Sequence, residues 1–220
     1  MAGFQAHLSA SVLPAAGLAT LSFAMETLSL IQAGAVFAVG AVGGFLPDLD
    51  ADSGKPLAFL MQVVSVMVPS LVYVRVAPWV GASPEAVICY FAGFWLALRY
   101  GLFVLIKRAT VHRGAMHSIP FALLCAGLAY LLFLPSAPQV ALLAGIAVGL
   151  TSMGHLILDE VDAFEFKMGL IPVAKKSSGT ALKLWSRSAG ATLLLYSLVA
   201  VTYAAILTDG FQHIPKPGGW

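Results

Sequence analysis

Residues 139–158 read QVALLAGIAVGLTSMGHLIL, a run in which His155 carries the only ionisable side chain. A stretch of about 20 apolar residues is long enough to cross the hydrocarbon core of a bilayer as an α-helix. Asp159 follows the run directly. The run therefore predicts a membrane-spanning helix with a polar end.

Six further apolar runs flank this one, at residues 8–24, 28–46, 57–79, 86–106, 118–134 and 189–208. Turn-forming residues separate them at 47–56, 81–84 and 135–138. The runs at 8–24 and 118–134 are the shortest. This pattern predicts an all-α, polytopic transmembrane helix bundle of about seven spans, with residues 1–220 forming a single integral membrane domain.

The composition supports the same fold class. Hydrophobic residues make up 60% of the chain and charged residues 10%, with a mean hydropathy of +0.91, whereas a soluble domain has about a quarter charged residues. No basic stripe interleaved with aromatic residues is present, so we expect no nucleic-acid partner. The first residues lack the basic region of a cleaved signal peptide, and we expect the N-terminus to be retained.

The basic residues indicate an orientation. With seven spans, the N-terminus and the loops at 47–56, 107–117 and 159–188 fall on one face. Most of the lysines and arginines lie there, while Arg75 and Lys216 lie on or near the other face. By the positive-inside rule the first face is cytoplasmic and the C-terminus lies outside.

Four polar segments near helix ends fall on this same face. They contain His7; Asp48, Asp50 and Asp52; His112, Arg113 and His117; and His155 with Asp159. Charged groups inside a membrane segment cost several kcal/mol unless they are paired, hydrated or bound to a metal. The span assignment did not use these residues, so their convergence is independent evidence for a shared site.

The residue types in these segments suit a metal site. His155 and Asp159 stand four apart, which places both side chains on one face of a helix. Asp48 and Asp50 follow Pro47 in a turn that can present two carboxylates to one point. Imidazole and carboxylate together are the ligands of Zn, Mn or Fe hydrolytic sites, and a second carboxylate can bridge two metals.

Two other residues have candidate roles beside these ligands. Arg113, with its fixed charge and fork-shaped donors, suits a phosphate or carboxylate on a substrate. Ser118 is placed either to orient substrate or water, or to cap the helix that follows it.

Each segment also has a simpler interpretation. His7 alone is equally explained as a hydrogen-bonded structural residue, and Asp48 alone as a turn residue. Arg113 with Lys107 and Arg108 can serve as a topology signal, and His155 with Asp159 can form an interhelical hydrogen bond. The acids Glu160, Asp162 and Glu165 are expected to be mainly solvated. All of these interpretations holding at once is less probable than any one of them.

The ordered motifs resemble the YdjM-like family of bacterial inner-membrane proteins, which are described as metal-dependent hydrolases. The resemblance rests on His7, Leu-Pro-Asp-Leu-Asp at 46–50, His-Arg-Gly-x-x-His-Ser at 112–118 and Gly-His-Leu-x-x-Asp at 154–159. It implies a multi-span helical fold in the inner membrane. The chain departs from the family pattern at Ala51, where members often have His, and at Asp162, where they often have Thr.

The leading hypothesis is a membrane-embedded, metal-dependent hydrolase that acts at the cytoplasmic face on a lipid or another amphipathic phosphoester or ester. Its cofactor is expected to be a divalent ion, Zn or Mn. The predicted metal ligands are His7, Asp48, Asp50, His112, His117, His155 and Asp159, and the predicted catalytic residues are Asp48, Arg113 and Ser118. The alternatives are a non-catalytic membrane subunit or assembly factor and, less favoured because the acids lie at one face, a transporter.

Overall fold

Seven helices make up most of the part of the chain that the structure describes. The structure is a computed structural model that describes residues 4–50, 55–105, 114–167, 171–174, 181–186 and 188–212. The helices are α1 (Phe4–Ala24), α2 (Leu30–Gly43), α3 (Lys55–Val80), α4 (Pro84–Leu96), α6 (Ile119–Phe133), α7 (Pro138–Val161) and α8 (Ala189–Gln212). A 3₁₀ turn, η1 (Leu46–Asp50), follows α2, and a π-helical segment, η2 (Ala97–Leu102), continues α4. Each predicted apolar run corresponds to one helix, which confirms the predicted helical membrane bundle.

The first two helices differ in length from the prediction. Five are long and apolar enough to cross a membrane, whereas α2 has 14 residues and α6 has 15. At 1.5 Å per residue these two reach only about 21–23 Å, compared with a hydrocarbon core of about 30 Å. The first run, expected to be short, forms a full-length helix, and the second is short instead. A capping box formed by Ser29 and Gln32 starts α2 late, and the helix ends at Gly43.

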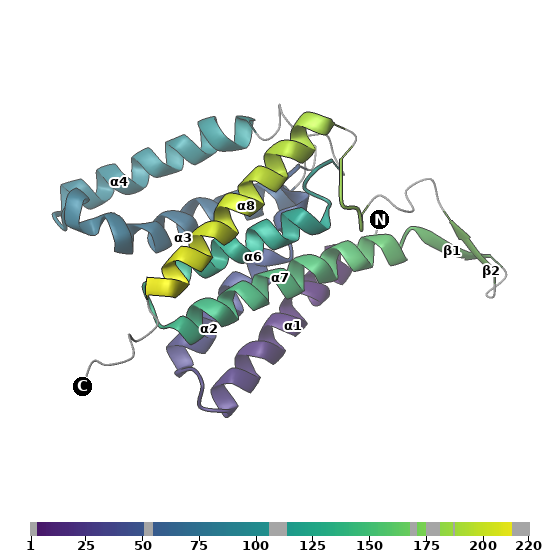
Figure 1. Ribbon diagram of the computed structural model, residues 1–220, viewed down its shortest axis with the longest axis horizontal. Helices are drawn as coiled ribbons and strands as arrows, with labels where there is room; N and C mark the ends of the chain where they lie inside the picture. The colour runs from purple at the N-terminus through teal and green to yellow at the C-terminus, as the bar shows by residue number, and fades with distance from the viewer. Residues whose placement is uncertain are drawn as a thin grey trace.

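Helix α7 lies at the centre of the bundle. It packs against α1, α2 and α6, while α8 lies on α6, and α3 pairs with α4 at the side (Figure 1). The buried fraction of the most apolar window is 56% for α7 but 11% for the α4 span and 6% for α8. Three alanines of α7, Ala141, Ala144 and Ala147, are fully buried, and small residues of this kind let membrane helices approach closely. The outer helices therefore present apolar side chains to lipid.

The two ends of the bundle differ in the helix termini that meet there. Helix α1 begins, and α7 ends, at one end, whereas α8 ends at the opposite end (Figure 1). At that opposite end Arg75 of α3 donates hydrogen bonds to the carbonyls of Leu131 and Leu132, in the last turn of α6. A cation at this position interacts favourably with the carbonyl groups at the C-terminal end of a helix. Arg75 thus lies on the side that the sequence predicted.

A small β-hairpin follows α7. Strand β1 (Phe164–Lys167) pairs antiparallel with β2 (Ile171–Ala174), with Phe164 opposite Ala174 and Lys167 opposite Ile171. The sequence predicts only a loop at residues 159–188, and the hairpin lies within that loop. It extends away from the helices and does not change the bundle (Figure 1).

Candidate metal centre

Five of the predicted site residues lie together at the end of the bundle where α1 begins. We call them the polar cluster: His7 of α1, Asp48 of η1, His117 two residues before α6, and His155 and Asp159 of α7. They come from four separate segments of the chain. The sequence predicted this convergence. Successive spans return the chain to alternate faces of the membrane, and each of these segments lies at a helix end on the same face.

Asp48, His117 and His155 form the inner part of the polar cluster. The Oδ1 atom of Asp48 lies 3.6 Å from Nε2 of His117 and 3.6 Å from Nε2 of His155. One ligand atom from each of the three residues lies within 4.8 Å of the other two. This carboxylate and two imidazoles therefore converge on one point.

His7 and Asp159 form the second part of the polar cluster. The Oδ1 atom of Asp159 lies 3.5 Å from Nε2 of His7, and the Oδ2 atom lies 3.6 Å from Nε2 of His117. The His7 ring stacks on His155 with 4.2 Å between centroids and 23° between ring planes. Asp159 thus connects His7 to His117, and His7 fixes the plane of the His155 ring.

Close packing of α2 against α7 places Asp48 beside His155. The hydroxyl of Thr151 donates to the Gly40 carbonyl at 2.8 Å, and the hydroxyl of Ser152 donates to the Gly43 carbonyl at 2.8 Å. A Cβ atom on Gly43 would lie 2.9 Å from the Val148 Cα atom, so only glycine fits there. These bonds fix the end of α2, and hence η1, relative to the last turns of α7.

The contact with α1 is equally tight. A Cβ atom on Gly44 would lie 2.6 Å from the Cβ atom of Ser11, whose own hydroxyl donates to the His7 carbonyl at 2.8 Å. Gly44 therefore brings the turn before Asp48 directly against the first turns of α1. This contact places His7 close to the other members of the polar cluster.

The polar cluster is mostly buried. His117 and His155 are fully buried and Asp159 is 1% exposed, whereas the Asp48 side chain is 30% exposed. Burial by itself raises the pKa of Asp48, but the adjacent His117, His155 and His7 outweigh burial and leave that pKa below its ordinary value. Asp48 is therefore an ionised carboxylate at neutral pH, and it is the member of the cluster that is most open to a ligand.

The residues present fit a divalent metal ion. Both ring nitrogens of His155 are buried without a hydrogen-bond partner among the described residues, and a buried polar group left in this state costs about 1–3 kcal/mol. The separations of 3.5–3.6 Å are longer than hydrogen bonds. Two ligand atoms bound tetrahedrally at about 2.1 Å from one ion lie about 3.4 Å apart, which is close to these values.

The other predicted site residues are less well placed or lie outside the description. Ser118 is at the N-cap position of α6, but its hydroxyl donates to the Ala115 carbonyl at 2.5 Å and makes no capping bond. Asp50 belongs to η1, although its side chain lies outside the description. His112 and Arg113, as well as Asp52, lie outside the described residues.

Two features near the polar cluster were not predicted. Thr151 and Ser152 position α2, and their signal was present, because they stand four and three residues before His155 within an apolar run. The segment Ala181–Ser186 crosses the same end of the bundle: the Ala181 amide donates to Glu160 at 3.3 Å, and the Ile119 amide donates to the Lys183 carbonyl at 3.0 Å. Glu160 therefore accepts a hydrogen bond from a segment about 20 residues away, a contact that the sequence did not predict.

The comparisons with known proteins give one match. The family model described as YdjM inner membrane protein matches residues 1–213. No curated protein and no solved structure matches the chain. The match includes every segment that contributes to the polar cluster.

Proposed function

The chain belongs to the YdjM inner membrane protein family, and we propose that it is a membrane-embedded hydrolase that depends on a divalent metal ion, Zn or Mn. The observation that carries this proposal is the convergence of half-buried Asp48 with the buried His117 and His155, with ligand atoms within 4.8 Å of one another. Imidazole nitrogen and carboxylate oxygen are common ligands of these ions in hydrolytic sites.

In this proposal Asp48, His117 and His155 hold the ion. When bound, the ion lowers the pKa of a water molecule and supplies a nucleophile at neutral pH. Asp159 orients His117 and His7 through its two oxygens, in the manner of the carboxylates that hold ligating histidines in position. From the sequence we assign His112 and Asp50 as further ligands and Arg113 as the group that binds a substrate anion.

The alternative is a non-catalytic membrane subunit whose polar cluster stabilises the bundle. The burial of His117, His155 and Asp159 favours it, because a structural network is closed to solvent. A structural network is also expected to be fully hydrogen-bonded. The nitrogens of His155 make no such bond to the described residues, and this favours a ligand.

We further propose that the polar cluster faces the cytoplasm. The basic residues of the sequence gather on this side, and they mark the cytoplasmic side of bacterial membrane proteins. A phosphatase fused after Asp209 should then be active on the periplasmic side of the membrane. A tail found in the cytoplasm would contradict this orientation.

Hydrolysis assays on the purified protein test the enzymatic proposal. We expect protein loaded with Zn²⁺ or Mn²⁺ to hydrolyse a chromogenic phosphodiester or ester, and Asp48→Asn to lower that rate at least about 100-fold because it removes a ligand charge. Glu85→Gln is the matched control, since it removes a carboxylate at the first turn of α4, at the other end of the bundle. No hydrolysis of either substrate class, or equal rates for Asp48→Asn and the wild-type protein, would contradict the proposal.

A further inference from the structure

An apolar groove lies beside the polar cluster. It has a volume of about 240 Å³. Three segments line it: α1 with Leu8 and Val12, the end of α2 and the residues after it with Ala41, Val42 and Phe45, and α3 with Phe59, Leu60 and Val63. Every lining residue is a hydrocarbon side chain. The volume is below the roughly 300–1,000 Å³ of pockets for drug-sized ligands, so the groove suits a narrow chain better than a large ring system.

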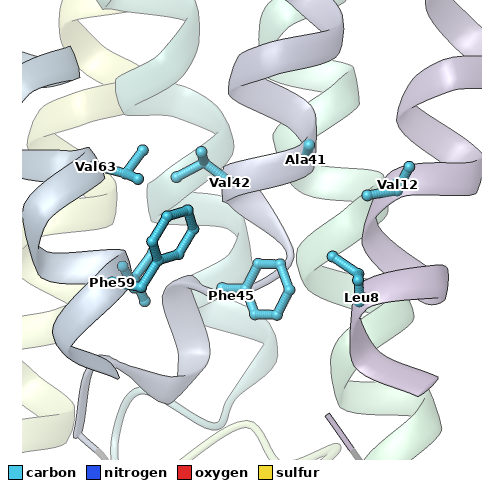
Figure 2. Close-up of a pocket in the computed structure, with 8 residues that line it drawn as sticks. Leu8, Val12, Ala41, Val42, Phe45, Phe59 and Val63 are labelled. Atoms are coloured by element: carbon cyan, nitrogen blue, oxygen red, sulfur yellow. The ribbon is translucent and has the colours of Figure 1, made fainter. Parts of the chain in front are cut away.

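The groove follows from the small residues of α2. Figure 2 shows α2 between α1 and α3, with Leu8 and Val12 on one side and Phe59 and Val63 on the other. Ala41 lies between these flanking helices, and its small methyl side chain leaves the space between α1 and α3 open. The lining helices α1 and α3 are membrane spans. Helices of this length and composition are surrounded by bilayer hydrocarbon, so a lipid chain can reach the groove from the side.

The groove leads toward the polar cluster. Leu8 is the neighbour of His7 in α1, and Phe45 stands three residues before Asp48. In Figure 2, Leu8, Phe45 and Phe59 lie at one level, and Val12, Ala41, Val42 and Val63 lie at the next. The first level is the one nearer to η1, and Asp48 of η1 is the most exposed of the five cluster side chains.

We propose that this groove binds one hydrocarbon chain of a membrane lipid. A chain lying along Val12, Ala41 and Phe45 places the polar end of its lipid near Asp48. Resting on the proposed hydrolase function, this geometry assigns the substrate class: a lipid whose ester or phosphoester lies at the headgroup level. In the hydrolysis, the oxygen of water bonds to the carbonyl carbon or phosphorus, the bond to the leaving oxygen breaks, and that oxygen receives a proton.

Photolabelling tests the groove without requiring catalysis. The full-length protein is placed in vesicles of phosphatidylethanolamine and phosphatidylglycerol that include phosphatidylglycerol with a diazirine in its acyl chain. We expect crosslinks to concentrate on Leu8, Phe45 and Phe59. Ala41→Phe fills the groove and should lower these crosslinks roughly tenfold, the effect of losing contact with about two methylene groups.

The matched control is Ala38→Phe, the same substitution one turn earlier on α2. Ala38 is exposed and does not line the groove, so the crosslinks should persist in this variant. Crosslinks spread evenly over lipid-facing residues such as Ile31, or unchanged by Ala41→Phe in a protein that retains its melting temperature, would overturn the proposal.

A second measurement tests the assignment of the substrate class. With p-nitrophenyl alkyl phosphodiesters of increasing chain length, kcat/KM should rise about fourfold per added methylene until the groove is filled. Ala41→Phe should remove this dependence, so that long and short substrates are hydrolysed with similar kcat/KM. A flat dependence in the wild-type protein would overturn the assignment. If no substrate is hydrolysed, the enzymatic proposal fails, but the photolabelling still decides whether the groove binds a lipid chain.

Discussion

Replacing His155 by glutamine is expected to lower the affinity for Zn²⁺ or Mn²⁺ by more than about 100-fold. His155 contributes a nitrogen that lies 3.6 Å from the Asp48 carboxylate, and its removal leaves only two of the three converging ligands. Substitutions of residues that only hold a ligand in position typically cost 10–100-fold in metal affinity, so loss of a direct ligand should cost more. Competition with a chromogenic chelator, on protein purified in detergent, measures the change.

His7→Gln is the matched control for this experiment. His7 stacks on His155 and approaches Asp159, but it is not one of the three converging residues. Its replacement should therefore cost between about 10- and 100-fold in metal affinity, less than replacement of His155. Equal affinities of the wild-type protein and His155→Gln, with both proteins folded, would contradict the assignment of the ligands.

Gly43→Ala is expected to destabilise the protein by about 1–3 kcal/mol, which is the usual cost of inserting a methyl group into a packed contact. The added Cβ would lie 2.9 Å from both the Val148 Cα atom and the Thr151 hydroxyl oxygen. The backbone atom cannot move aside, so α2 must shift away from α7. The variant should show a lower melting temperature in detergent and, because η1 follows α2, a weaker affinity for metal.

Gly34→Ala provides the comparison on the same helix. A Cβ atom at Gly34 has no neighbour within 4 Å, and exchange of glycine for alanine inside a helix stabilises by roughly 0.5–1 kcal/mol when nothing obstructs it. The two substitutions should therefore change the melting temperature in opposite directions. A melting temperature of Gly43→Ala equal to that of Gly34→Ala would show that the close contact between α2 and α7 does not form.

The sequence predicted which ends of the helices meet. Apolar runs of bilayer length indicate the helices, and the alternation of sides places His7, Asp48, His117, His155 and Asp159 at one end. No structure was needed for this step, because each span must return the chain to the other face. The convergence of the polar cluster therefore follows from the order of the segments alone.

The sequence did not predict the packing of the helices. Most of the spans are apolar on all sides, so periodicity does not indicate which face meets a neighbour. The contact of Gly43 with Val148, and the groove that Ala41 leaves open, depend on side-chain fit between helices far apart in the chain. Thr151 and Ser152 gave a partial signal, because hydroxyl groups inside a span usually bond to another helix or to their own backbone.

The hydrogen bonds of the segment Ala181–Ser186 were also beyond prediction. Its contact with α6 runs from the Ile119 amide to the backbone carbonyl of Lys183, and backbone groups have no side-chain signature in a sequence. The acceptor for the Ala181 amide is Glu160, whose position directly after Asp159 gave no sign of a partner more than 20 residues away.

X-ray absorption spectroscopy on the wild-type protein, combined with elemental analysis of the same sample, tests the central claim most directly. We predict at least one equivalent of Zn or Mn per chain, with nitrogen and oxygen ligands at about 2.0–2.2 Å and an imidazole signature. A folded protein that contains no stoichiometric metal, and takes up none when Zn²⁺ or Mn²⁺ is added, would contradict the metal centre and the hydrolase proposed from it.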